Sequence, residues 1–145
     1  MATDRTAEVT WRGSLMEGRG SIDRVGSGAF GPLDVTWASR AEDPAGRTSP
    51  EELIAAAHAS CYSMALSHAL AQDGTPPDRL DTSATVTFVP GTGITKVALR
   101  VRGRVPDIDE AGFLAKAEDA KKGCPVSKAL AAVPEITLDA ALSDN

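Results

Sequence analysis

The sequence predicts an α+β protein that forms one domain over residues 1–145. Six short stretches alternate apolar and polar residues as strands do, and one long alanine-rich stretch has helical spacing. The expected order is three strands, a helix, two strands, two helices and a strand. No internal repeat or long linker divides the chain, and 145 residues suffice to bury a core without disulfide or metal support.

Residues 7–39 are expected to form a three-stranded antiparallel meander, with the clearest alternation over 33–38. The glycines of residues 26–31, GSGAFG, have the spacing of a dinucleotide-binding loop. Such a loop binds phosphate only when a helix follows directly, whereas here Pro32 and a strand pattern follow. We therefore interpret it as a hairpin loop, and residues 40–48 as a polar connection to the long helix.

The long central helix is expected over about residues 50–73. Ser49 suits the N-cap, a proline occupies the first helical position, and Glu52 completes a capping box with Ser49. Apolar side chains recur around much of the circumference, which predicts an interior helix. Because Cys61 lies near its middle, we interpret this element as a buried scaffold that carries a thiol.

The C-terminal part, about residues 83–142, is expected to contain two strands, two helices and a closing strand. The second of these strands, over 94–105, has one apolar face. Its other face carries a basic stripe that consists of Lys96, Arg100, Arg102 and Arg104. We interpret the stripe as a solvated face, with substrate or partner binding as the alternative. Asp109 caps the first helix, Gly123 is its expected C′ residue, and Cys124 is the expected N-cap of the second.

Composition excludes several classes of protein. The net charge of −5 without a Lys/Arg run argues against a nucleic-acid partner. Apolar content of 42% and charged content of 24% are ordinary for a globular protein, and no apolar run is long enough to span a membrane. The N-terminus lacks the apolar core of a secretory signal, which predicts a cytoplasmic protein. Two cysteines in a reducing compartment are more often catalytic, redox-active or simply buried than a permanent disulfide.

The chemistry is expected to come from the two thiols, because no other reactive groups converge. A buried thiol is inert unless a positive charge or a helix N-terminus favours its thiolate. Cys124 has a helix start in the sequence, whereas Cys61 needs an arginine from elsewhere. The residues alone leave open a redox pair or two unremarkable buried cysteines. His58 and His68 lack the spacing of a zinc pair, so we expect packed or hydrogen-bonded histidines and no metal site.

Two segments resemble signature segments of a known family. Residues 49–64, SPEELIAAAHASCYSM, and 122–127, KGCPVS, look like those of the OsmC/Ohr peroxidases, the osmotically inducible and organic hydroperoxide resistance proteins. The expected element order also matches that fold, so the resemblance covers essentially the whole chain. It is closer to the OsmC branch, because Arg40 follows the third strand and His58 lies in an Ala-Ala-His-Ala run.

The resemblance implies an OsmC-like fold in an intertwined homodimer, with long central helices packed against antiparallel or mixed sheets. It also implies a thiol peroxidase that reduces organic hydroperoxides, and hydrogen peroxide more weakly, in oxidative or osmotic stress defence. No cofactor is implied. A thiol, dithiol or lipoylated protein would restore the reduced enzyme. The alternative is a non-enzymatic module of the same fold that senses oxidation or binds an apolar ligand.

Site residues follow from the same resemblance. Cys61 would attack the peroxide and become a sulfenic acid, and Cys124 would resolve it as a disulfide. Arg40 would keep Cys61 ionised and polarise the peroxide, with Glu51 holding the arginine; Arg19 is a lesser candidate for that arginine. Ten residues of straight helix, about 15 Å, separate Glu51 from Cys61. We therefore expect Glu51 to act across the dimer.

Overall fold

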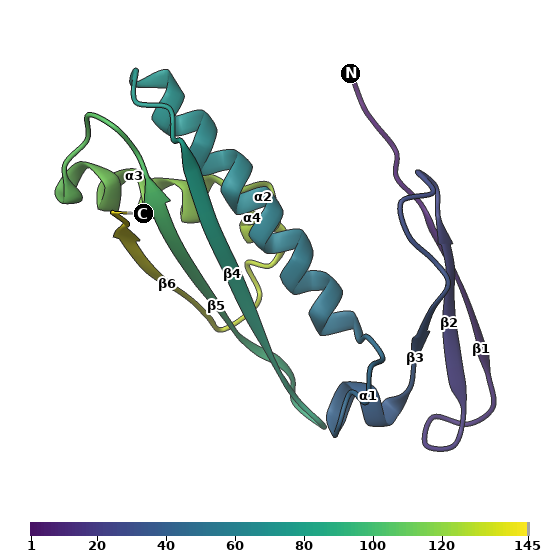
Figure 1. Cartoon of the computed structure of the whole chain (residues 1–145). Helices are drawn as coiled ribbons and strands as arrows, with labels where there is room; N and C mark the ends of the chain where they lie inside the picture. Colours follow the sequence, from purple (N-terminus) through teal and green to yellow (C-terminus); the bar gives the residue numbers. More distant parts are fainter. Residues whose placement is uncertain (145) are drawn as a thin grey trace. The chain divides into compact units, whose positions relative to one another are not determined.

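The computed structural model describes residues 1–144. These residues divide into two compact units, one over residues 1–53 and one that begins at Ile54. Each unit contains one three-stranded sheet, and the α+β class is confirmed (Figure 1). The first unit holds β1 (Ala7–Arg12), β2 (Arg19–Val25), β3 (Leu33–Val35) and α1 (Trp37–Ala41). The helix α2 (Pro50–Gln72) begins in the first unit and continues into the second. The second unit also holds β4 (Arg79–Val89), β5 (Gly93–Arg104), α3 (Glu110–Gly123), α4 (Pro125–Ala129) and β6 (Glu135–Leu142).

The first sheet is the expected antiparallel meander, in the order β1-β2-β3. The hairpin loop between β2 and β3 is confirmed, because no helix follows its glycines. Gly20 is required where the sheet is tightest, since a Cβ there would come 2.7 Å from the Trp11 ring and 2.8 Å from a Val35 methyl. Every residue of β1 is exposed, and Ile22 is the only buried hydrophobic side chain among residues 1–53.

The third strand is shorter than the sequence predicted. It ends at Val35, and α1 begins at Trp37 in place of the expected strand end and polar connection. The cause is a capping box, in which the Thr36 hydroxyl accepts from the Ser39 N–H while the Ser39 hydroxyl accepts from the Thr36 N–H. These local hydrogen bonds outweigh the alternation pattern, and they place Arg40 in the last turn of a helix.

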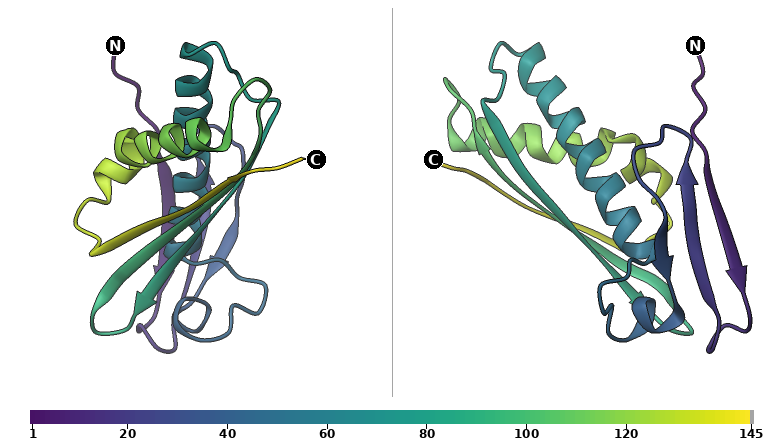
Figure 2. Two further views of the ribbon diagram at one scale, coloured as in Figure 1. Left: turned by 90° about the vertical axis from the view of Figure 1, so that its left-hand side faces the viewer. Right: turned by 45° about the vertical axis from the view of Figure 1, so that its right-hand side comes forward.

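The second sheet has the order β4-β5-β6, with β4 and β5 antiparallel and β5 and β6 parallel. A parallel neighbour needs a crossover, which α3 and α4 provide. Figure 2 shows α3 crossing α2 at a steep angle beside this sheet. The core of the unit joins helices and strands through Tyr62, Leu66, Leu70, Leu99, Val101, Val105, Phe113, Ala120 and Cys124. Gly103 lets the Phe113 ring approach, since a Cβ there would lie 2.7 Å from it.

The helix α2 is buried along one stripe, whereas the apolar residues around much of its circumference predicted an interior helix. Positions four residues apart are buried, namely His58, Tyr62, Leu66 and Leu70. Met64, on another face, is 71% exposed. The expected capping box is only half formed: the Glu52 N–H donates to the Ser49 hydroxyl, but the Glu52 carboxylate accepts from the hydroxyl of Thr48.

Cys124 lies where two helices meet. It is the C-cap of α3 and the N-cap of α4, so Gly123 is the last residue of α3 and not the expected C′ residue. The following proline explains this, because it favours an extended conformation for the residue before it, and Cys124 has φ −58° and ψ 126°. The helix therefore ends without a left-handed glycine.

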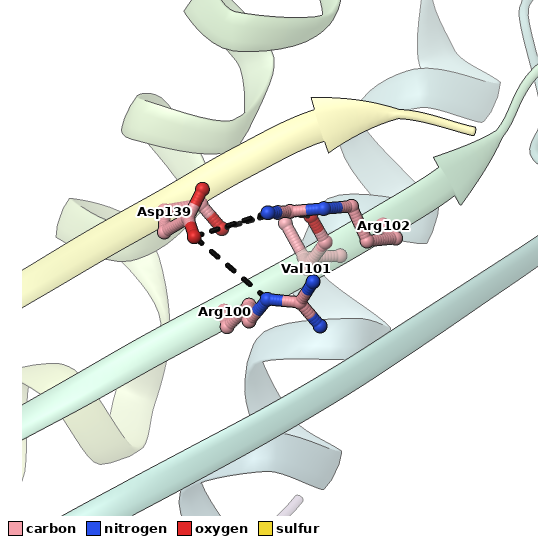
Figure 3. A network of polar contacts seen from close by, with 4 residues as sticks. All are labelled: Arg100, Val101, Arg102 and Asp139. Carbon is pink, nitrogen blue, oxygen red and sulfur yellow. Dashed lines mark hydrogen bonds and ion pairs between the residues drawn. The ribbon is translucent and has the colours of Figure 1, made fainter.

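The basic stripe on β5 is paired with acidic side chains. Arg100 and Arg102 both contact the Asp139 carboxylate on β6, at 3.7 and 3.0 Å (Figure 3). Lys96 pairs with Glu135, which also lies on β6, and Arg104 pairs with Asp78, which comes just before β4. The interpretation as a solvated, charged face is confirmed.

Candidate active site

The structure brings the two cysteines together. Cys61 Sγ on α2 and Cys124 Sγ at the α3–α4 junction are 3.1 Å apart, although 63 residues separate them in sequence. Both are free thiols; Cys61 is half-buried and Cys124 is fully buried. The Tyr62 hydroxyl donates to the Ala117 carbonyl at 3.0 Å, which links α2 to α3 beside the thiols. Two sulfurs at this distance can form a disulfide with little movement of their supports.

The two thiols differ in acidity. Burial raises the pKa of the Cys61 thiol, and the hydrogen bond with Cys124 adds to that effect. Burial also acts to raise the pKa of Cys124, but the Ser127 N–H, the Cys61 thiol and the Ser127 hydroxyl outweigh it. The pKa of Cys124 is therefore below its ordinary value. Within this pair the negative charge is better supported on Cys124, so Cys61 needs a further positive group to react as a thiolate.

Arg40 and Glu51 form a two-point ion pair within the first unit. Glu51 Oε1 accepts a hydrogen bond from Nε of Arg40 at 2.8 Å, and an Nη of Arg40 lies 2.8 Å from the same oxygen as an ion-pair contact. The Glu51 side chain is 7% exposed and that of Arg40 is 33% exposed, so one edge of the guanidinium is fixed and part of it stays accessible. The α1 helix that carries Arg40 is held in turn by the Ser39 hydroxyl, which donates to the Thr48 carbonyl at 2.9 Å.

Arg19 lies elsewhere in the first unit. It begins β2, is exposed, and stands opposite Arg12 in the β1–β2 register. The structure therefore unites Arg40 with Glu51 and Cys61 with Cys124, in separate units, and leaves Arg19 apart from the Arg40–Glu51 pair.

One member of the site was not predicted from the sequence. His58 was expected to be packed or hydrogen-bonded, and its Nε2 lies 2.7 Å from the hydroxyl of Ser127. Ser127 was missed, although its position three residues after the N-cap Cys124 is a signal that could have identified it. Both side chains are buried, at 0% and 7% exposure.

The part of the chain that the structure describes holds no cluster of three or more His, Cys, Asp or Glu side chains that could bind a metal ion. The same residues contain no helix that is long and apolar enough to cross a membrane. The remaining His68 is exposed, with its Nε2 3.3 Å from the Gln72 side-chain nitrogen.

Comparisons with known proteins agree with this fold over nearly the whole chain. The chain is 41% identical over 142 residues to Peroxiredoxin OsmC of Escherichia coli (strain K12) and of Shigella flexneri, covering 96% of each sequence. It resembles the structure of OhrB, an organic hydroperoxide resistance protein of Bacillus subtilis, with a TM-score of 0.64 and 25% identity over 95% of this chain and 98% of that one. An OsmC structure from Legionella pneumophila shares the fold, with a TM-score of 0.65 and 20% identity over 95% and 96% of the two chains.

These similarities place the protein in the class of peroxidases of the peroxiredoxin type. Residues 42–139 also match the model of the OsmC-like protein family. The chain belongs to the OsmC family.

Proposed function

We propose that the protein is a cysteine-based peroxidase that reduces organic hydroperoxides, and hydrogen peroxide more weakly. The observation that carries the proposal is the pair of reduced sulfurs 3.1 Å apart, one partly accessible and one buried. The family membership supports the reaction, and the likeness to an organic hydroperoxide resistance protein supports the substrate class.

The proposed cycle begins at Cys61, because a peroxide can reach the half-buried sulfur more readily than the buried one. The Cys61 thiolate forms a bond to one peroxide oxygen, the O–O bond breaks, and the other oxygen leaves as an alcohol once protonated. Cys124 then attacks the sulfenic sulfur, water leaves, and a disulfide remains. An external thiol, dithiol or lipoylated protein returns two electrons and restores both thiols.

Arg40 and Glu51 are proposed to activate Cys61. A fixed guanidinium favours a nearby thiolate and stabilises the charge that develops on the departing oxygen. The two-point pairing with Glu51 holds the guanidinium in one orientation, as this role requires. Because a straight helix keeps Glu51 about 15 Å from Cys61 of its own chain, we propose that the ion pair serves Cys61 of the partner subunit.

A homodimer is part of this proposal. Residues 1–53 carry a sheet with a single buried hydrophobic side chain, Ile22, while Val9 and Trp11 on β1 are 59% and 42% exposed. A three-stranded sheet normally packs a face on another layer, and a second copy of the chain would supply one. In the dimer the two units would work as one functional domain. A cycle that needs a thiol reductant fits stress defence in the reducing cytoplasm.

The reaction can be tested by titrating free thiols after one equivalent of an alkyl hydroperoxide. We expect rapid loss of both thiols to an intramolecular disulfide, and full recovery with a dithiol. Cys61→Ser is expected to abolish turnover, whereas Cys124→Ser should accumulate a sulfenic acid that a dimedone-type probe captures. Full activity of Cys61→Ser would refute the mechanism. Comparing alkyl, fatty-acid and hydrogen peroxides as substrates then tests the substrate class.

The action across the dimer can be tested by complementation. Cys61→Ser and Arg40→Met are each expected to be inactive as homodimers. In a mixed dimer of the two, the site that combines Cys61 of one chain with Arg40 of the other is intact, so about half of the wild-type activity should return. If the arginine serves its own chain, both sites of the mixed dimer are defective and no activity returns.

A further inference from the structure

A buried histidine stands behind the thiol pair and has no role in the mechanism above. His58 is fully buried, its Nε2 lies 2.7 Å from the Ser127 hydroxyl, and its Nδ1 has no hydrogen-bond partner among the described residues. A buried polar ring with one unmet nitrogen costs free energy, whereas an apolar residue at this position would not carry that cost. The cost is explained if the ring acts on a neighbour.

That neighbour is the buried thiol. Ser127 lies in the first turn of α4, three residues after the N-cap Cys124; its hydroxyl contacts His58, and its N–H and hydroxyl help to lower the pKa of the Cys124 thiol. His58 Nε2 therefore lies 2.7 Å from the hydroxyl of Ser127, Ser127 follows Cys124 by three residues in the same helix start, and the Cys124 sulfur lies 3.1 Å from that of Cys61. All four residues belong to the second unit.

We propose that His58 is a positioning residue for the resolving thiol, which orients the Ser127 hydroxyl so that it supports Cys124 as the thiolate that closes the disulfide. This inference rests on the proposed function, in which Cys124 attacks the Cys61 sulfenic acid. It assigns His58 and Ser127 to the second step of the cycle and leaves the first step to Cys61 and its arginine.

The two neutral forms of the imidazole give the contact a direction. With the proton on Nε2, His58 donates to Ser127 Oγ, and the hydroxyl hydrogen is free to point at the Cys124 thiolate. With the proton on Nδ1, Nε2 accepts the hydroxyl hydrogen, and the serine can only accept from the Cys124 S–H. The form protonated on Nε2 is therefore the one that supports the Cys124 thiolate, and the ring keeps its own proton throughout.

The hydroxyl of Ser127 serves the step that closes the disulfide. An electron pair of the Cys124 sulfur forms the S–S bond, the S–O bond of the Cys61 sulfenic acid breaks, and the proton from the Cys124 thiol ends on the departing hydroxide as water. Burial lowers the pKa of His58, which keeps the ring neutral and available for either hydrogen-bond arrangement.

The first test isolates Cys124 from peroxide chemistry. In a Cys61→Ser background, the pH dependence of alkylation reports the acidity of the Cys124 thiol alone. Adding Ser127→Ala or His58→Leu is expected to move the midpoint of this profile to higher pH and to slow alkylation at neutral pH about tenfold. His58→Gln, whose amide nitrogen can replace Nε2 as a donor, should restore most of the rate. Ser63→Ala is the matched control. Ser63 lies on α2 like His58, and its hydroxyl donates to the Thr82 hydroxyl on β4 at 2.8 Å, so the variant removes a comparable contact without touching either sulfur.

The second test separates the two steps of the cycle in the protein with both cysteines. In a single turnover with an alkyl hydroperoxide, Ser127→Ala should form the sulfenic acid at the wild-type rate and then close the disulfide about tenfold more slowly. An unchanged alkylation profile and an unchanged rate of closure in Ser127→Ala and His58→Leu would overturn the inference. Failure to form any sulfenic acid in the wild type would instead contradict the proposed function. Thermal unfolding of each variant identifies a loss of folding, and Ser127→Ala decides the question if His58→Leu does not fold.

Discussion

The second unit carries a continuous core that runs from α2 through β5 to α3; Cys124 belongs to that core and Cys61 packs against it. The first unit buries one hydrophobic side chain, Ile22, yet it fixes an arginine and a glutamate to each other with one short hydrogen bond and one ion-pair contact. One unit thus holds the two sulfurs by packing, and the other holds a charge by pairing. The difference teaches that the proposed nucleophile and the proposed cation are held by separate means, so that each can be altered without the other.

The largest effect on stability is expected when a large side chain is removed from the core of the second unit. Phe113→Ala removes a ring with no exposed surface and should lower the free energy of unfolding by about 3–5 kcal/mol. Ile22→Ala in the first unit should cost about 2 kcal/mol, because few buried neighbours surround it. Denaturant unfolding measures both. An equally large loss for Ile22→Ala would break the comparison, and it would favour the proposed dimer, in which a second copy of the chain covers the first sheet.

The next effect concerns the charge. Replacing Arg40 alone leaves the buried Glu51 carboxylate without this ion-pair partner, which would itself destabilise the protein. The cleaner variant therefore combines Arg40→Met with Glu51→Gln. This pair should slow formation of the Cys61 sulfenic acid about a hundredfold while the protein stays folded. Single-turnover kinetics measures the rate, with Arg19→Met as the control that leaves it unchanged. A hundredfold loss in the control and none in the double variant would reverse the assignment of the arginine.

A smaller effect is expected from His58, whose pKa burial lowers from the ordinary value of 6.5. The unfolded chain then binds a proton near pH 6.5 while the folded chain still holds the ring neutral. Stability should therefore fall as the pH drops below about 6.5, by at most about 1.4 kcal/mol per pH unit. His58→Gln should remove this part of the slope, measured as the difference between unfolding midpoints at two pH values. His68→Gln, at an exposed position, should keep the slope, and a slope unaltered by His58→Gln would contradict the expectation.

The smallest effect is expected on the charged face of β5. The hydrogen bond from Arg102 holds the pKa of the Asp139 carboxyl below its ordinary value, so any stability from this pair is present near neutral pH and lost as acid protonates the carboxylate. Because both partners meet water, Asp139→Asn should shift the unfolding midpoint slightly at low salt and not measurably at 1 M salt. A large shift that persists at high salt would show that this face is covered.

Elements with strong local signals in the sequence were predicted correctly, and elements with weak signals were missed. The proline-capped start of α2, the bounds of β6 and the cap at Asp109 were predicted correctly. The short helix α1 was missed, because a single capping box makes these five residues helical although the preceding residues alternate as a strand does. The roles of Cys61 and Cys124 came from a family resemblance, and only the fold could place their sulfurs together. Ser127 was missed because its partner, His58, lies 69 residues away.

The unequal burial of the two sulfurs also bears on how the oxidised enzyme would be recycled. Only the Cys61 side of the disulfide is open to an incoming reductant, so the mixed disulfide would form there and Cys124 would depart as the leaving group. Its lowered pKa makes Cys124 the better of the two for that departure. The same asymmetry that assigns the attacking sulfur in oxidation would thus set the direction of reduction.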